Sequence, residues 1–218
     1  MLFDFGGTLD ADGLHWSLRF YQAYHAVGGV LDFAAFDPIF KLADEAVARL
    51  PEIRRLGFRA AIDALTRLLG DRLPDRVDAA AVAGRVHHEA VAVVTRNRPV
   101  LERLGQRFRL GIVSNFTGNL QPCLEELGLA RLFVTASDSA LVGWNKPDAR
   151  IFSHTLEQLG VPAHAAWMVG DNFDADIRGA AAVGMRTCWI APADRAAPPG
   201  LVPTARIHRL PDIETVLA

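Results

Sequence analysis

The stretch of sequence that decides the fold is Leu2-Phe3-Asp4-Phe5-Gly6-Gly7-Thr8-Leu9. Its first part is a short apolar run, which is typical of a buried strand. The two glycines after it allow the backbone to turn sharply and to expose its own amides. The carboxylate of Asp4 ends the apolar run without a cation next to it in the sequence, and a buried, unpaired charge is costly. We therefore expect Asp4 to have a functional role at the end of the first strand.

A long helical region follows this strand. Between about residues 14 and 95, apolar residues recur at helical spacing and no strand pattern is present. Glycines and prolines divide the region, including a break at Asp37-Pro38. The pattern predicts about four helices, over residues 16–27, 36–50, 58–69 and 77–94.

After Pro99 the chain alternates between helices and strands. Strands are predicted at 110–113, 132–135, 166–169, 187–190 and 205–210, and helices at 100–104, 120–127, 149–159 and 175–182. Such alternation indicates right-handed crossovers, so the fold class is α/β, with a doubly wound parallel sheet covered on both faces. We expect residues 1–13 and 96–218 to form this core domain and residues 14–95 to form an inserted, all-helical cap domain.

Composition limits the kinds of partner. Half of the 218 residues are apolar and the net charge is −2, which gives no electrostatic footprint for nucleic acid or anionic lipid. No stretch approaches the ~20 apolar residues of a membrane span. Cys123 and Cys188 are far apart and outside metal-ligand spacing, so a disulfide framework and a zinc site lack support. We expect a cytoplasmic monomer or homodimer that acts on a small molecule.

Polar side chains stand at the ends of several predicted strands. Asp4 ends the first strand, Ser114 follows the second, Asp171 follows the strand at 166–169, and Lys146 lies in a loop. Lys146 is one of only two lysines in a chain with 21 arginines, which favours a functional role for its ammonium group. Ligands of open parallel sheets bind beyond the carboxyl ends of the strands. We therefore expect these four side chains to converge on one spot.

This set of groups suits phosphoryl transfer. A carboxylate such as Asp4 can attack phosphorus and form an aspartyl-phosphate, but a dianionic phosphate repels it unless a cation intervenes. Asp4 and Asp171 could share a magnesium ion, which prefers a few oxygen ligands and several waters. Ser114, Lys146 and nearby amides could then bind the remaining phosphate oxygens of a small phosphorylated substrate.

Four ordered motifs match a known family. They are residues 4–9, residues 112–115 around Ser114, Lys146-Pro147-Asp148, and Gly170-Asp171 through Asp176. With these motifs the sequence resembles the haloacid dehalogenase superfamily, in the branch whose helical cap is inserted after the first strand. The resemblance covers essentially the whole chain, and the order and spacing of four motifs make it specific.

The resemblance implies a role for each motif residue. Asp4 would be the nucleophile, and Ser114 and Lys146 would hold the transferred group. The implied substrate-binding residues are Gly7, Thr8 and Asn115. The implied Mg²⁺ ligands are Asp4, Asp171, Asp176 and the backbone carbonyl of Gly6.

The sequence departs from the family pattern at Gly6. Most phosphatases of the family have a second aspartate there, which protonates the leaving group and later activates water. In one interpretation, the leaving group needs little protonation, as in an anomeric or acyl phosphate, or the acid comes from elsewhere. The candidate acids are Asp10, Asp12, His15 and His25.

Two other interpretations change the reaction or remove it. Haloacid dehalogenases also lack the second aspartate, but they need no metal, so the presence of Asp171 argues against them. Phosphonoacetaldehyde hydrolases use a cap lysine as a Schiff base, and Lys41 is the only lysine outside the third motif. The last alternative is a binding protein of the same fold that has lost catalysis.

Overall fold

A parallel sheet of six strands forms the centre of the α/β part of the protein in the computed structural model, which describes residues 1–217. The strand order is β3-β2-β1-β4-β5-β6, so the chain builds one half of the sheet outward from β1 and then returns to build the other half. The strands are β1 (Leu2–Phe3), β2 (Gly111–Ser114), β3 (Thr135–Asp138), β4 (Trp167–Gly170), β5 (Arg186–Ile190) and β6 (Ala205–Ile207). The predicted doubly wound parallel sheet is confirmed.

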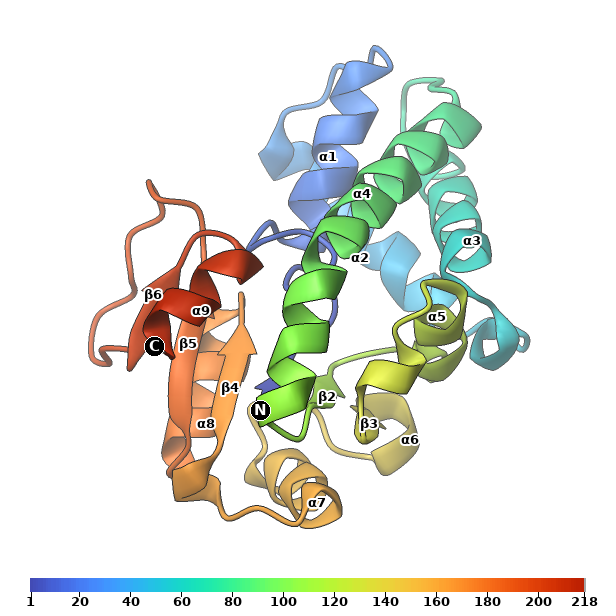
Figure 1. Cartoon of the computed structure of the whole chain (residues 1–218). Coiled ribbons are helices and arrows are strands. Elements are labelled where there is room, and N and C mark those ends of the chain that lie inside the picture. The colour runs from blue at the N-terminus through green and yellow to red at the C-terminus, as the bar shows by residue number, and fades with distance from the viewer. Residues whose placement is uncertain (218) are drawn as a thin grey trace.

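Helices cover both faces of this sheet (Figure 1). Because successive side chains of a strand point to opposite faces, Leu2 packs with the apolar face of α7 (Ala149–Leu159), whereas Phe3 packs with residues of α4 (Ala79–Arg107). Both side chains are fully buried. Burial on both faces explains why β1 reads as a continuous apolar run rather than as an alternating one.

The register of the strands brings their carboxyl ends to one edge. Phe3 pairs with Ile112 of β2 and with Val169 of β4, so Asp4, Ser114 and Asp171 all follow these positions by one or two residues. The backbone N–H of Asp4 donates to the carbonyl of Val169 over 2.9 Å, which fixes the start of the loop after β1. The site therefore begins where three neighbouring strands end.

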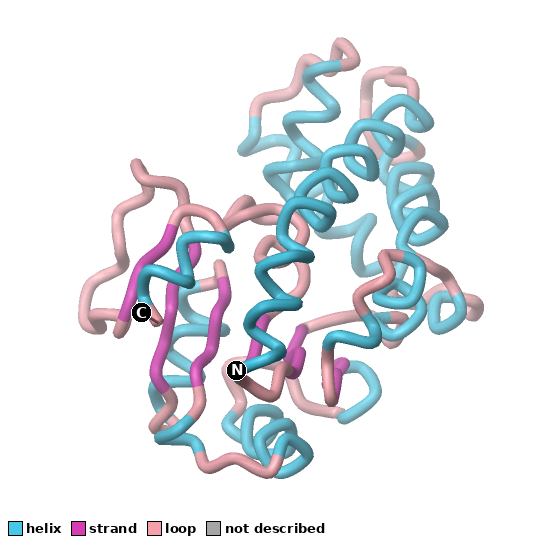
Figure 2. Tube along the Cα trace, in the orientation of Figure 1, coloured by secondary structure: helices cyan, strands magenta, loops and turns pink. Residues whose placement is uncertain are grey.

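Four helices stand beyond the carboxyl ends of the strands, on the side where the site lies (Figures 1 and 2). They are α1 (Trp16–Ala26), α2 (Phe33–Val47), α3 (Phe58–Gly70) and the first part of α4. The four predicted helices are therefore present. Their division from the core at residues 13/14 and 95/96 stays a prediction.

The predicted break at Asp37-Pro38 is wrong, and so is the prediction of separate helices at 77–94 and 100–104. Pro38 lies inside α2, and Pro99 lies inside α4, which runs unbroken for 29 residues from the helical region into the core. A proline inside a helix leaves the carbonyl four residues earlier without its donor. Those carbonyls belong to Ala34 and Thr95, both exposed residues, so water can bond to them.

The remaining helices are short. They are α5 (Leu120–Glu126), α6 (Ser139–Val142), α8 (Gly179–Ala182) and α9 (Ile213–Val216). The predicted helix at 175–182 opens as a π-helical turn over Phe173–Arg178 and continues as α8. The predicted strand at 132–135 begins only at Thr135, because residues 130–132 form a 3₁₀ turn. Across residues 1–217, the helices lack the combination of length and apolar character that crossing a bilayer requires.

Candidate active site

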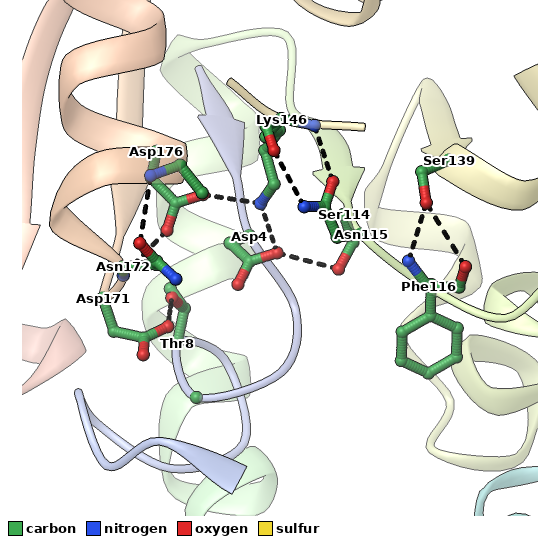
Figure 3. A network of polar contacts seen from close by, with 12 residues as sticks. Asp4, Thr8, Ser114, Asn115, Phe116, Ser139, Lys146, Asp171, Asn172 and Asp176 are labelled. Carbon is green, nitrogen blue, oxygen red and sulfur yellow. Dashed lines mark hydrogen bonds and ion pairs between the residues drawn. The ribbon is translucent and has the colours of Figure 1, made fainter. Parts of the chain in front are cut away.

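Asp4 is the centre of a buried polar network (Figure 3). Its Oδ1 accepts a hydrogen bond from Oγ of Ser114 at 2.8 Å and one from Nζ of Lys146 at 2.7 Å. Within residues 1–217, no hydrogen bond reaches the second oxygen, Oδ2. One oxygen thus fixes the orientation of the carboxylate and the other remains available to a ligand.

Lys146 joins two of the carboxylates. Its Nζ also lies 2.6 Å from Oδ1 of Asp176, and the side chain is almost completely buried. Burial by itself would lower the pKa of Lys146, but the carboxylates of Asp176 and Asp4 raise it above its ordinary value. Lys146 is therefore a fixed positive charge at neutral pH.

Asn115 holds the backbone of Lys146. Its Nδ2 donates to the Lys146 carbonyl at 3.0 Å, and its Oδ1 accepts the Lys146 N–H at 2.7 Å. The predicted substrate-binding residue thus clamps the loop that carries the lysine, and it also lines the adjoining pocket.

Three carboxylates lie close together next to the ammonium group of Lys146. Oxygens of Asp4, Asp171 and Asp176 lie within 4.8 Å of one another, and all three residues are buried. Burial, followed by repulsion from Asp4 and Asp176, raises the pKa of Asp171 well above its ordinary value. Burial also raises the pKa of Asp176 to about 6, although Lys146 opposes this shift. The protein places more negative charge here than its own cation balances.

The residues fit a hard divalent cation. With all three carboxylates ionised, the cluster and Lys146 together carry a charge of −2, and the three acids offer only oxygen ligands. Thr8 and Asn172 orient two of the acids: Oγ1 of Thr8 donates to Asp171 at 3.0 Å, and the N–H of Asn172 donates to Asp176 at 3.0 Å. Mg²⁺ satisfies this charge and this ligand type.

A pocket of about 220 Å³ opens over the network. Its polar floor comes from the ends of the strands and includes Asp4, Ser114, Lys146, Asp171 and Asp176. Its opposite wall comes from α1, α2 and α3 and is largely apolar, with Trp16, Phe40, Val47, Ala61 and Leu65. A ligand in this pocket would contact charged groups at one end and apolar side chains at the other.

Gly7 and Thr8 lie beside this pocket and do not line it, which differs from the expectation that they bind substrate. The N–H of Gly7 donates to Oδ1 of Asp10 at 2.8 Å, and the hydroxyl of Thr8 is used by Asp171. A β-carbon at Gly7 would lie 2.6 Å from both carboxylate oxygens of Asp171, and its φ is +89°. Gly7 therefore allows the loop to approach the acid closely. Gly6, in contrast, lines the pocket.

Of the four residues predicted as candidate acids, one lines the pocket and three do not. Asp10 is buried in an ion pair with Arg19 at 2.7 Å, Asp12 accepts hydrogen bonds from Asn97 and from a backbone N–H, and His25 contacts a backbone carbonyl. Of the four, His15 lines the pocket. Burial lowers the pKa of His15, an effect that Asp37 partly opposes.

Lys41 does not line the pocket that contains Asp4. Its exposed Nζ pairs with Asp37 at 2.6 Å, over a neighbouring hollow. This placement removes the structural support for a Schiff base at Lys41.

Trp16 lines the pocket, although it is not among the predicted site residues. The helical spacing of Trp16, Phe20, Tyr21 and Tyr24 predicts that most of these rings pack inside the helical region and that one or two near the link from β1 face the substrate. The signal that distinguishes Trp16 is its place in the first turn of α1, next to the link from β1.

The chain is similar to a family of hydrolases and to characterised members of it. The family model described as haloacid dehalogenase-like hydrolase matches residues 1–184. The chain is 37% identical to the pyrimidine 5′-nucleotidase YjjG of Escherichia coli over 111 residues, which cover 50% of this chain and 49% of that protein. It is 36% identical to a phosphoserine phosphatase of Thermus thermophilus over 105 residues, which cover 48% and 42% of the two chains.

A solved structure extends the similarity over the whole fold. The 2-haloacid dehalogenase of Pseudomonas syringae matches with a TM-score of 0.57 and 26% identity, over 99% of this chain and 96% of the other. The matches to the two curated relatives, in contrast, span somewhat less than half the length of those proteins.

Proposed function

The chain belongs to the haloacid dehalogenase-like hydrolases, and on that basis we propose that it is a magnesium-dependent phosphoric monoester hydrolase with Asp4 as the nucleophile. The observation that carries the proposal is the geometry of Asp4. One of its oxygens is held by Ser114 and Lys146, and its carboxylate lies within 4.8 Å of the oxygens of Asp171 and Asp176.

The residues of the chain divide the work of the reaction. Oδ2 of Asp4 bonds to phosphorus as the bond from phosphorus to the leaving-group oxygen breaks, which gives an aspartyl-phosphate. Ser114 and Lys146 would donate hydrogen bonds to the transferred group as well as to Asp4. Water then attacks the phosphorus of this intermediate and releases phosphate, to which both protons of the water pass, and the Asp4 carboxylate is restored.

Asp4, Asp171, Asp176 and the carbonyl of Gly6 would hold the magnesium ion. When bound, the ion would supply positive charge that offsets the repulsion between the Asp4 carboxylate and the phosphate. The unbalanced charge of the carboxylate cluster supports this assignment.

The cluster also favours phosphate esters over haloacids. A dehalogenase of this family needs no metal and would have no use for the buried carboxylate of Asp171 at this position. Two of the named relatives, a nucleotidase and a phosphoserine phosphatase, support a phosphate monoester as the substrate.

Dehalogenation is the second candidate. It is favoured by Gly6, which offers no side chain for proton transfer, and by the similarity to the 2-haloacid dehalogenase of Pseudomonas syringae. A halide leaves without a proton, so this reaction would not require the missing acid.

One assay separates the two candidates. The purified protein is incubated with Mg²⁺ and a panel of phosphate esters, and in parallel with 2-chloropropionate, while phosphate and chloride are measured. We expect phosphate release that stops when EDTA is added and that is abolished by Asp4→Asn. Asp174→Asn, an exposed acid near the site, is the matched control and should keep full activity. Chloride release in EDTA without phosphate release would contradict the proposal.

A further inference from the structure

Trp16 occupies the space that a side chain at position 6 would need. A β-carbon added at Gly6 would lie 2.6 Å from Nε1 and 3.1 Å from Cδ1 of Trp16. Real β-carbons do not approach other atoms this closely, so a side chain at position 6 would collide with the indole edge of Trp16. The indole of Trp16 can therefore take this position only because residue 6 has no side chain.

The N–H of this indole makes no hydrogen bond to any part of the chain that the structure describes. Nε1 is buried and makes no hydrogen bond within residues 1–217, yet Trp16 lines the pocket together with Asp4 and Gly6. A buried tryptophan N–H normally finds an acceptor, because leaving it unpaired costs free energy. An acceptor supplied by the ligand would satisfy it.

Packing holds the indole in this position. Its ring stacks on Phe20 with centroids 5.5 Å apart and meets the edge of Phe58 at 6.2 Å. The guanidinium of Arg19 lies 6.0 Å from the centre of the ring. The N–H is thus a preorganised donor above Gly6 rather than a side chain free to turn away.

We propose, building on the phosphatase function above, that Trp16 donates its N–H to the leaving-group oxygen and thereby selects esters whose leaving group departs as a stabilised anion. In the phosphatases that this chain resembles, an aspartate two residues after the nucleophile protonates the leaving group, and Gly6 holds that position here. A donor next to Gly6, in the pocket that Asp4 also lines, is therefore placed to bind the oxygen that departs as Oδ2 of Asp4 bonds to phosphorus. The pair of electrons of the broken P–O bond stays on the leaving oxygen.

The indole N–H can bind this oxygen but cannot protonate it. Tryptophan is a hydrogen-bond donor only and keeps its proton at all working pH values. A carboxylate or a phenolate leaves as a stable anion, whereas an alkoxide does not. The substrate class is therefore an acyl or aryl phosphate, and the apolar wall of Phe40, Val47 and Leu65 suits the organic part of such a molecule.

The test compares leaving groups in the wild type and in Trp16→Phe. The substrates are acetyl phosphate, 4-nitrophenyl phosphate, phenyl phosphate and glycerol 3-phosphate, each assayed with Mg²⁺. We expect the wild type to hydrolyse the first two at least about 100-fold faster, in kcat/KM, than glycerol 3-phosphate, which is within the range that a general acid contributes. In Trp16→Phe, kcat/KM for phenyl phosphate should fall about 10- to 100-fold, the value of a hydrogen bond to a charged group.

The dependence on the leaving group distinguishes donation from packing. Because 4-nitrophenolate carries less charge on its oxygen than phenolate, Trp16→Phe should lower kcat/KM less for 4-nitrophenyl phosphate than for phenyl phosphate. The matched control is Trp167→Phe, which removes an indole at the start of β4, at the opposite end of the strand from the site. This control should leave the ratio of the two substrates unchanged.

A second measurement does not depend on turnover. In Asp4→Asn labelled with ¹⁵N, the indole N–H signal of Trp16, assigned by its absence from the double variant with Trp16→Phe, should shift when 4-nitrophenyl phosphate is added. The signal of Trp167 should stay in place.

The outcomes distinguish failure of the inference about Trp16 from failure of the proposed phosphatase function. Equal losses for both aryl phosphates in Trp16→Phe, or an unmoved indole signal, would show that Trp16 only packs, and the phosphatase function would stand. Rapid hydrolysis of glycerol 3-phosphate that is lost in His15→Asn would identify His15 as a proton donor and overturn the inference. No phosphate release from any of the four substrates would instead contradict the proposed function itself.

Discussion

Replacing Asp171 with asparagine should separate binding of the cation from stability of the fold. The substitution keeps the size of the side chain and an oxygen that can accept the hydrogen bond from Thr8. It removes one of the three carboxylates, so the cluster with Lys146 changes from a charge of −2 to −1. We expect Asp171→Asn to bind Mg²⁺ far more weakly than the wild type does.

The magnitude follows from ligand linkage. At a Mg²⁺ concentration 100 times the Kd, binding stabilises the folded wild type by about 2.7 kcal/mol. For a protein of this length, that corresponds to an increase in Tm of roughly 5–10 °C. In Asp171→Asn most of this increase should be lost.

Without the cation the effect should have the opposite sign. The pKa of Asp171 in the folded protein lies well above 3.8, so its stabilising contribution is complete below about pH 4 and is lost as pH rises through the folded pKa. In EDTA at pH 7, Asp171→Asn should therefore be more stable than the wild type. The difference should shrink as the pH is lowered toward 4.

The assay is thermal unfolding in EDTA and in a series of Mg²⁺ concentrations, at pH values from 4 to 8. Asp174→Asn is the matched control, because Asp174 is exposed and pairs with Arg178 at 2.7 Å outside the cluster. It should respond to Mg²⁺ as the wild type does. An equal increase in Tm for Asp171→Asn and the wild type would refute the cation site, and an apo variant less stable than apo wild type would refute the argument from repulsion.

Other predictions concern groups outside the reaction. Arg19→Met leaves the buried carboxylate of Asp10 without its partner and should lower the free energy of unfolding by about 3–5 kcal/mol, measured by urea denaturation; a loss below about 1 kcal/mol would contradict this. Burial raises the pKa of both Cys123 and Cys188 to about 12, so neither thiol should react with a disulfide reagent in the folded protein, and both should react once it is unfolded in urea.

Local pattern was sufficient for the elements that are long or bounded by strong signals. The helix at 149–159 has the predicted bounds, because Asp148 caps its first turn and Gly160 ends it in the left-handed conformation. The start of β3 was not predictable, because contacts with other elements decide where a short apolar run becomes a strand. The unbroken α4 was not predictable either, because packing against other elements decides whether a proline ends a helix.

The residues of the site show the same division. The sequence alone indicated Asp4, Ser114, Lys146 and Asp171, because parallel strands deliver the residues that follow them to one edge of the sheet. It could not show that Lys146 bridges Asp4 and Asp176, since those contacts join parts of the chain up to 142 residues apart.

For this protein the amino-acid sequence by itself determined the α/β fold and the chemical identity of the groups at the strand ends, because both depend on periodicity and on local backbone rules. Only the tertiary structure decided which of those groups face the pocket. It directed the amide of Gly7 to Asp10 and the hydroxyl of Thr8 to Asp171, and it placed the indole of Trp16 next to Gly6. The physical reason is that side-chain direction near a loop depends on contacts between distant segments, which spacing along the chain does not encode.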